Sequence, residues 1–217
     1  MGKKALEMIF LDLDGTLTDP QEGIIQSAIY ALQKLGLPVP DPTGMTWMIG
    51  PPLVDSFSQL GVADPDQAVT YYRERFATVG LFENTVYAGI PAALDQMQNA
   101  GHGMCLATSK PEVFARRITA HFGLDTYLNE TCGASLDRSR NSKTAVLRHA
   151  LNLTGATAET SVMVGDRHHD FDAAKELGLP SVAVTWGYGT EAEYARADVT
   201  CTQPSELLMA IQSVLKG

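Results

Sequence analysis

The stretch Phe10-Leu11-Asp12-Leu13-Asp14-Gly15-Thr16-Leu17-Thr18 decides how this chain folds. It begins at the end of the apolar run 8–11, which is typical of a buried strand in a parallel sheet. Asp12 and Asp14 follow two residues apart, so both carboxylates project to the same side of an extended chain. Gly15 permits a sharp turn, and we expect its amide to remain open to a ligand. The stretch therefore indicates a strand that ends in a polar site.

Two neighbouring carboxylates repel each other, and one tends to take up a proton unless a divalent cation removes the repulsion. The alternative interpretation is that Asp12 and Asp14 are ordinary turn residues, because Asp and Gly are frequent in turns. The choice between a cation site and a plain turn depends on what the rest of the chain brings to the same place.

Composition limits the classes of function. The chain has 217 residues, of which 45% are hydrophobic and 19% charged, as in an ordinary globular protein. Its net charge of -9 argues against nucleic acid or an anionic membrane as the main partner. No apolar run has the length of a membrane span, and no secretory signal is evident, so we expect a cytoplasmic protein. Cys105, Cys132 and Cys201 are few and far apart, which is typical of structural thiols in a reducing compartment.

The order of helix and strand patterns predicts two domains. Residues 19–85 show only helical patterns, which predicts a small all-helical insertion, or cap. Residues 1–18 and 86–217 alternate strands with helices, which predicts an α/β core with a doubly wound parallel sheet. The expected helices are 21–35, 53–60, 64–79, 91–100, 112–122, 143–153, a helix ending at 177, and 204–215; the expected strands are 104–107, 130–132, 161–164 and 181–185.

Polar residues follow several of these strands. Thr108 and Ser109 come after the strand 104–107, and Asp166 follows the strand 161–164. Ligands of doubly wound sheets bind just outside the carboxyl ends of the strands, so these residues and Asp12 are expected to meet in one crevice. Phosphoryl transfer through a carboxylate nucleophile requires that nucleophile, an acid/base, a hydroxyl and a cation to hold phosphate oxygens, and a magnesium site.

The motifs together resemble those of the haloacid dehalogenase-like hydrolase superfamily, in particular its phosphoglycolate phosphatase-like branch with a helical cap. The resemblance covers nearly the whole chain and rests on Asp12-Leu13-Asp14-Gly15-Thr16, Thr108 at a strand end, Lys143 before a helix, and Gly165-Asp166 with Asp170. It implies that Asp12 is the nucleophile, Asp14 the acid/base, Thr108 the phosphoryl-holding hydroxyl, and Lys143 the cation that steadies Asp12 and the phosphate. It also implies Mg²⁺ held by Asp12, the backbone carbonyl of Asp14 and Asp166, with Asp170 close by or acting through water.

Further residues are candidates for contact with substrate: Leu13, Gly15, Ser109 and Lys110 beside the reacting centre, and Gly50, Pro51 and Arg73 in the insertion. The segment around Gly50 could equally be a tight turn, and Arg73 and Arg75 could be solvated charges on a helix. His168 and His169 are expected to be solvated or rim residues, because a hard oxygen site does not call for imidazole.

The sequence therefore predicts a Mg²⁺-dependent phosphatase that acts on a small phosphorylated metabolite through an aspartyl-phosphate. The cap is expected to close over substrate, with hinges near 18–20 and 87–89. Phosphoglycolate, a 5'-nucleotide and a sugar phosphate remain open as substrates. A phosphomutase and a phosphoacceptor signalling domain are the less favoured alternatives, and the helical insertion argues against the second.

Overall fold

The computed structural model describes residues 7–137 and 139–215. The chain divides into two compact units, residues 1–18 with 86–217 and residues 19–85. Two short strands, β2 (Thr18–Asp19) and β3 (Thr85–Val86), pair where the chain passes between the units. Within the described residues, no helix combines the length and the apolar character needed to cross a membrane.

The first unit is built on a six-stranded sheet in which every neighbouring pair is parallel, in the order β5-β4-β1-β6-β7-β8. The strands are β1 (Met8–Leu11), β4 (Gly103–Pro111), β5 (Glu130–Ala134), β6 (Ser161–Gly165), β7 (Ser181–Val184) and β8 (Val199–Cys201). All four residues of β1 are buried, because the strand is central and helices cover both faces. The chain moves outward from β1 through β4 to β5 and then restarts at β6 on the other side of β1. The edge between β1 and β6 is therefore the switch point, where ligands of such sheets bind.

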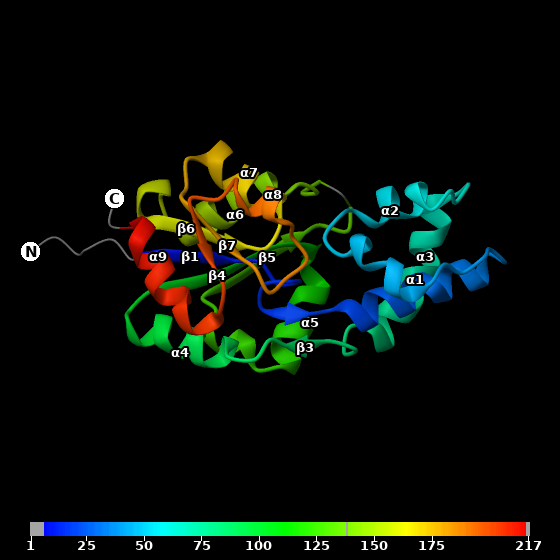
Figure 1. Cartoon of the computed structure of the whole chain (residues 1–217), viewed down its shortest axis with the longest axis horizontal. Helices are drawn as coiled ribbons and strands as arrows, with labels where there is room; N and C mark the ends of the chain where they lie inside the picture. Colours follow the sequence, from blue (N-terminus) through cyan, green and yellow to red (C-terminus); the bar gives the residue numbers. More distant parts are fainter. Residues whose placement is uncertain (1–6, 138, 216–217) are drawn as a thin grey trace, which may run out of the picture. The chain divides into compact units, whose positions relative to one another are not determined.

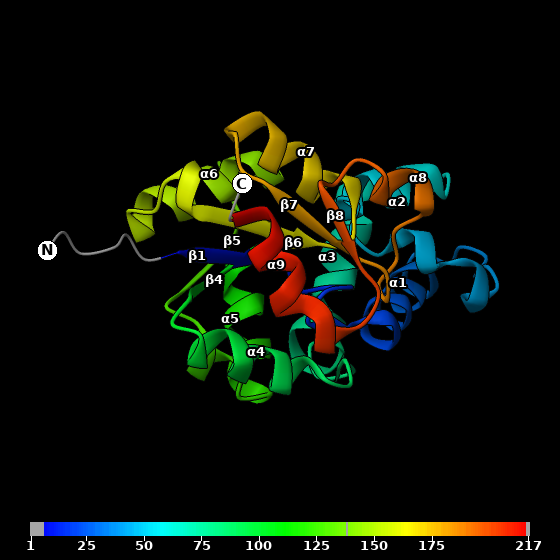
Figure 2. The same cartoon turned by 60° about the vertical axis from the view of Figure 1, so that its left-hand side comes forward.

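Helices cover both faces of this sheet, as Figures 1 and 2 show. One face carries α6 (Lys143–Thr154) and α7 (His168–Leu177), and the other carries α4 (Ile90–Asn99), α5 (Glu112–His121) and α9 (Leu207–Leu215). A short helix, α8 (Glu191–Tyr194), follows β7. The predicted doubly wound α/β fold is thus confirmed.

The core under α6 and α7 is formed by side chains that alternate along the strands. Met8 and Phe10 of β1 share it with Cys105 and Ala107 of β4, while Ile9 and Leu11 are buried on the opposite face. The remaining members are Cys132, Val146, Leu147, Ala150, Met163, Ala173, Ala174 and Leu179. Cys105, Cys132 and Cys201 are buried free thiols, in agreement with a structural role.

The second unit is helical, with α1 (Gln21–Lys34), α2 (Leu53–Gln59) and α3 (Pro65–Arg75), followed by a π-helical turn (Phe76–Gly80). A Cβ atom on Gly23 of α1 would lie only 2.0 Å from the carbonyl oxygen of Gly80, so glycine permits close packing there. Phe57 is fully buried and meets Tyr72 edge to face, with ring centroids 6.4 Å apart.

The structure differs from the sequence-based expectation in several short elements and in the extent of β4. The strand β8 and the helix α8 were not predicted, because three- and four-residue elements are too short to show a periodicity. The strand β4 continues to Pro111, with an irregularity in its pairing to β5 between Thr108 and Pro111. Thr108 therefore lies within the strand instead of just after it.

Candidate active site

Three aspartates from distant parts of the sequence meet at the switch point. Asp12, Asp166 and Asp170 are buried, and each offers a carboxylate oxygen within 4.8 Å of the others. Asp12 directly follows β1 and Asp166 directly follows β6. These strands are paired in register, with Leu11 opposite Val164, so the sheet itself delivers both carboxylates to one edge.

Asp166 is held by one oxygen and leaves the other without a protein partner. Its Oδ2 accepts a hydrogen bond of 2.8 Å from the backbone amide of Tyr188, whereas its buried Oδ1 has no hydrogen-bond partner among the described residues. Burial, followed by the charges of Asp170 and Asp12, raises the pKa of Asp166 well above its usual value. Because buried polar atoms are normally paired, the orphaned Oδ1 indicates a place for a cation.

Two glycines allow the backbone to surround Asp166. Gly15 has a φ of +84°, and a Cβ atom there would lie 2.1 Å from Asp166 Oδ2. A Cβ atom on Gly187 would lie 2.2 Å from the Gly15 carbonyl oxygen and 2.4 Å from Asp166 Oδ2. The Gly15 amide donates to the Thr18 carbonyl at 2.8 Å, so the expectation that it stays open to a ligand is wrong. Glycine is required here by the close approach of Asp166.

Lys143 joins two of the aspartates. It is the first residue of α6, and its buried Nζ lies 2.8 Å from Asp12 Oδ1 and 2.7 Å from Asp170 Oδ1. Burial by itself lowers the pKa of Lys143, but the two carboxylates outweigh it and the net shift is upward. The lysine is therefore a fixed positive charge beside Asp12.

Asp170 has two structural tasks. Besides pairing with Lys143, its Oδ2 accepts the Arg167 amide at 3.1 Å and caps α7. Burial raises the pKa of Asp170 to about 6, although Lys143 opposes the shift. Asp170 therefore both caps α7 and belongs to the buried aspartate cluster, and its Oδ1 is paired with the Lys143 ammonium.

Asp14 and Lys110 form a second, partly buried ion pair. The Lys110 ammonium makes an ion pair with Asp14 Oδ2, and Asp14 Oδ1 has no hydrogen-bond partner within the described part of the chain. Burial is the largest cause of the raised pKa of Asp14, with Lys110 acting in the opposite direction. Thr108 is buried on β4, the strand beside β1, and its Oγ1 accepts the Lys110 amide at 3.2 Å. Lys110, predicted beside the substrate, thus contacts Asp14 directly.

The other candidates are placed differently. The Leu13 side chain is fully buried, and its carbonyl accepts the amides that close the turn at 16–18. Ser109 is exposed. Gly50, Pro51 and Arg73 belong to the helical unit, and their contact with substrate stays a prediction.

Arg75 is not the solvated charge that the helical pattern indicated. Its guanidinium forms two hydrogen bonds with Glu83, of 2.6 and 2.7 Å, and a third of 3.3 Å with Ser27 Oγ. The arginine is therefore engaged within its own unit.

Sequence reasoning missed the role of the loop after β7, which donates hydrogen bonds to Asp166 and to the turn after Asp14. Trp186 donates from Nε1 to the Thr16 carbonyl at 3.0 Å, and Tyr188 supplies the amide for Asp166. The available signal was the Gly187-Tyr188-Gly189-Thr190 turn, whose glycines allow close approach.

Glu193 follows that loop, and the Thr190-x-x-Glu193 pattern marks it only as a capping-box residue at the start of α8. It accepts from Arg167 Nε at 3.0 Å and lies 2.5 Å from His168 Nδ1. His168 is thus held by Glu193, and its side chain is 31% exposed, so its placement at the rim of the site stays a prediction. Burial lowers the pKa of the neighbouring His169, with the charges of His168 and Arg167 acting in the same direction.

The arrangement is that of a known class. Residues 9–184 match a family described as Haloacid dehalogenase-like hydrolase, so the chain belongs to this family. Within it, the chain is a phosphoric monoester hydrolase, as the buried aspartate cluster and the relatives named as phosphatases indicate together.

Several proteins are similar to this chain along most of its length. The chain is 41% identical over 210 residues to a 5'-nucleotidase of Pseudomonas aeruginosa, covering 94% of this chain and 95% of that one. It is also 41% identical over 184 residues to the tyrosine-protein kinase PtkA of Mycobacterium tuberculosis, covering 84% of this chain but 63% of that longer protein. The crystal structure of a predicted phosphatase from Clostridium acetobutylicum superposes with a TM-score of 0.91 at 36% identity, covering 97% of this chain and 100% of the other.

Proposed function

We propose that the protein is a Mg²⁺-dependent phosphatase that transfers the phosphoryl group of a small phosphomonoester first to Asp12 and then to water. The carrying observation is the buried cluster of Asp12, Asp166 and Asp170, in which Asp166 Oδ1 has no hydrogen-bond partner among the described residues. A cluster of this kind is costly without a cation and suited to one that prefers oxygen.

The donor set fits Mg²⁺. Asp12 and Asp166 would hold it with carboxylate oxygens, and the Asp14 backbone carbonyl would add a third ligand. Asp170 would act through Lys143 or a water molecule, because its Oδ1 is 2.7 Å from that ammonium. When bound, Mg²⁺ supplies neutralisation of charge on the phosphoryl oxygens.

In the first step, a carboxylate oxygen of Asp12 attacks phosphorus, and the bond between phosphorus and the ester oxygen breaks. The departing alcohol takes a proton from Asp14, whose raised pKa makes proton donation easier near neutral pH. Lys143 beside Asp12 and the Thr108 hydroxyl would hold the phosphoryl oxygens during transfer.

In the second step, water attacks the phosphorus of the aspartyl-phosphate. Asp14 takes the proton from that water, the bond between phosphorus and Asp12 breaks, and inorganic phosphate leaves. Both carboxyl groups return to their starting states, so the cycle needs no other reactant.

The helical unit, residues 19–85, would act as a cap that excludes bulk water from the reacting groups. Gly50, Pro51 and Arg73 are its candidate substrate contacts. Because residues of the cap would select the substrate, the same core chemistry serves phosphoglycolate, nucleotides and sugar phosphates equally well.

Two substrate classes have specific support. The 41% identity to a 5'-nucleotidase along nearly the whole chain favours nucleoside 5'-monophosphates. Phosphoglycolate is the second candidate, since the chain is 30% identical over 187 residues to a phosphoglycolate phosphatase of Cupriavidus necator.

The test is a panel of phosphate esters containing nucleoside monophosphates, phosphoglycolate and sugar phosphates, assayed with Mg²⁺ and with chelator. We expect phosphate release that needs Mg²⁺ and that falls at least about 1,000-fold in Asp12→Asn, which removes the nucleophile while nearly keeping its shape. Phosphate release by Asp12→Asn at the wild-type rate would contradict the proposal, as would turnover that persists in chelator.

A further inference from the structure

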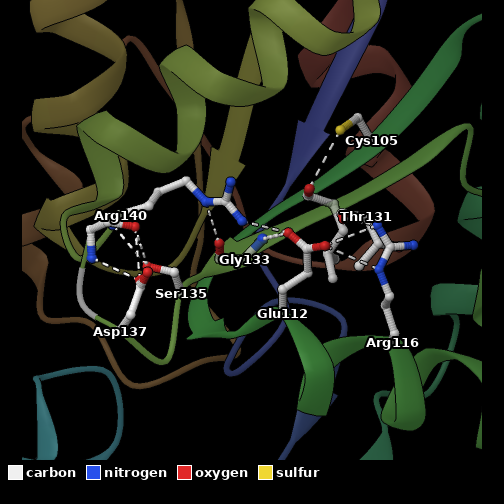
Figure 3. A network of polar contacts seen from close by, with 10 residues as sticks. Cys105, Glu112, Arg116, Thr131, Gly133, Ser135, Asp137 and Arg140 are labelled. Atoms are coloured by element: carbon white, nitrogen blue, oxygen red, sulfur yellow. Dashed lines mark hydrogen bonds and ion pairs between the residues drawn. The ribbon is translucent and has the colours of Figure 1, made fainter.

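Residues 139–142 lead to Lys143, and Arg140 anchors them to the neighbouring elements. Arg140 Nη2 donates to Glu112 Oε2 at 2.6 Å, and Arg140 Nε donates to the Gly133 carbonyl at 2.8 Å (Figure 3). The Glu112 carboxylate also accepts the Gly133 amide at 3.3 Å. Arg140 thus fastens residues 139–142 to both the end of β5 and the start of α5.

Glu112 is close in the chain to Lys110, the residue that contacts Asp14. It begins α5, two residues after Lys110, whose ammonium contacts Asp14. A Cβ atom on Gly133 would lie 2.6 Å from the Lys110 carbonyl oxygen and 2.7 Å from Glu112 Cα. The end of β5 therefore packs directly on the backbone that joins Lys110 to Glu112.

The described residues on either side of position 138 are joined by hydrogen bonds. The Ser135 amide donates to the Arg140 carbonyl at 2.9 Å, and the Arg140 amide donates to Ser135 Oγ at 2.9 Å. The Asp137 carboxylate accepts the Ser139 amide at 3.0 Å, and hydrogen bonds from Ser135 and then Ser139 lower the pKa of Asp137 to about 2. These bonds join Arg140 to Ser135, so we expect a displacement of Arg140 to disturb this contact as well.

Lys143 directly follows residues 139–142. Ser142 Oγ accepts the Ala145 amide at 3.1 Å and so fixes the start of α6. Lys143 is the next residue, three positions after Arg140, and its ammonium lies between Asp12 and Asp170. Only residues 141 and 142 separate Arg140 from Lys143, so we expect a shift of Arg140 to move Lys143 as well.

We infer that Glu112 and Arg140 are positioning residues: their ion pair sets where the Lys143 ammonium lies relative to Asp12. The inference rests on the proposed function, since it concerns the same nucleophile. The side chains of Glu112 and Arg140 are 27% and 23% exposed, so the pair adds little to global stability, whereas a misplacement of about 1 Å at a reacting group costs up to about 100-fold in rate.

The chain offers two matched controls. Arg148 lies on the same helix as Lys143 and pairs with Glu176 at 3.2 Å, with both side chains 57% exposed. Arg116 contacts the other oxygen of Glu112, at 3.1 Å, but lies on α5 and is 52% exposed. Arg116 also donates from Nη2 to the Thr131 carbonyl at 2.7 Å, and neither arginine has a hydrogen bond or ion pair with residues 135–137 or 139–142.

The first test measures kcat and KM for para-nitrophenyl phosphate with saturating Mg²⁺. Arg140→Gln is expected to lower kcat about 10- to 100-fold with a much smaller change in KM, because the substrate still binds but Lys143 is misplaced. Arg140→Lys keeps the charge but not the bond to Gly133, and should recover part of the loss. Arg148→Gln and Arg116→Gln should stay within about two-fold of wild type. Equal losses in Arg140→Gln and Arg148→Gln would overturn the inference.

A double-mutant cycle tests the route through Lys143. In a Lys143→Met background, Arg140→Gln should lower kcat by less than about two-fold, because the residue that it positions is already absent. A full multiplicative loss in that background would show that Arg140 acts elsewhere, and would overturn the inference.

Crystal structures provide a readout that does not need activity. The distance between Lys143 Nζ and Asp12 Oδ1 is 2.8 Å here, and it should lengthen in Arg140→Gln but not in Arg148→Gln. An unchanged distance in Arg140→Gln would overturn the inference. A wild-type enzyme without Mg²⁺-dependent hydrolysis would instead overturn the proposed function, while this distance still decides the role of Arg140.

Discussion

The two units of this chain treat charge in opposite ways. Among the described residues of the α/β unit, the buried aspartates and lysines are Asp12, Lys110, Lys143, Asp166 and Asp170. In the helical unit, residues 19–85, the buried polar side chains are Ser27 and Ser56, and its Arg75–Glu83 ion pair is 21% and 27% exposed. The α/β unit therefore buries charged side chains away from water, whereas the charged side chains of this pair in the helical unit stay partly exposed.

This difference separates function from stability. Burying a charge costs free energy unless it is paired, and even a paired buried charge rarely stabilises more than an apolar side chain would. The buried charges of the α/β unit are thus explained by the chemistry of the site. The interior of the helical unit is apolar and serves the stability of the fold. A substitution in the aspartate cluster should therefore lower activity more than stability, and a substitution in the core of the helical unit should lower stability more than activity.

The largest effect is expected for Asp166→Asn. We expect kcat/KM to fall at least about 1,000-fold, because a metal ligand is lost and metal catalysis supplies several kcal/mol. The metal-free protein should nevertheless melt at the same temperature or higher at pH 8, since a buried carboxylate with a raised pKa has been removed. Enzyme assays and thermal melts in chelator measure the two effects.

Asp172→Asn is the control for this change. Asp172 lies on α7, pairs with Arg196 and has a side chain that is 43% exposed, so its loss should leave kcat/KM unchanged. If Asp166→Asn instead lowered the melting temperature in chelator clearly below that of the wild type, the carboxylate would stabilise the fold. The contrast between the two units would then fail.

The second effect concerns Phe57→Ala in the helical unit. Phe57 is fully buried against Tyr72, so its truncation should lower the free energy of unfolding by about 3 kcal/mol. The Mg²⁺ concentration for half-maximal activity should not change, because the metal ligands lie in the other unit. Urea unfolding and a Mg²⁺ titration test this, and Leu37→Ala, at a side chain that is 37% exposed, should cost far less. A shifted Mg²⁺ requirement in Phe57→Ala would break the separation.

The third and smallest effect is the pH dependence of stabilisation by Mg²⁺. The pKa values of Asp166 and Asp170 are raised by burial, that of Asp170 to about 6 from a usual 3.8. For a raised pKa, the stabilising contribution is complete below the unfolded value and is lost as pH rises through the folded value. The metal-free protein should therefore lose stability between pH 4 and about pH 7.

Bound Mg²⁺ needs these carboxylates ionised, so its stabilisation should be larger at pH 8 than at pH 5. It should reach about 2 to 3 kcal/mol when Mg²⁺ is present at about 100 times its Kd. Thermal melts with Mg²⁺ and with chelator at both pH values measure the difference. An equal shift at both would mean that the buried acids do not bind the ion.

Much of the fold could be predicted from sequence because its signals are local. The apolar run 8–11 and the helical patterns of 21–35 and 143–153 match β1, α1 and α6 closely, since burial on a regular element imposes a period. The edge strand β8 lacked that signal. The convergence of Asp12 and Asp166 was also predictable, because parallel strands end at a common edge.

What the sequence by itself determined was the class of fold, the family and the set of aspartates, because strand ends and motif order are properties of the chain read in one direction. Only the tertiary structure decided which partner each group has. Lys110 contacts Asp14, Arg140 contacts Glu112 and Glu193 contacts His168 across 96, 28 and 25 residues. Such pairs depend on distances in space, and side chains far apart in sequence leave no periodic trace that would reveal them.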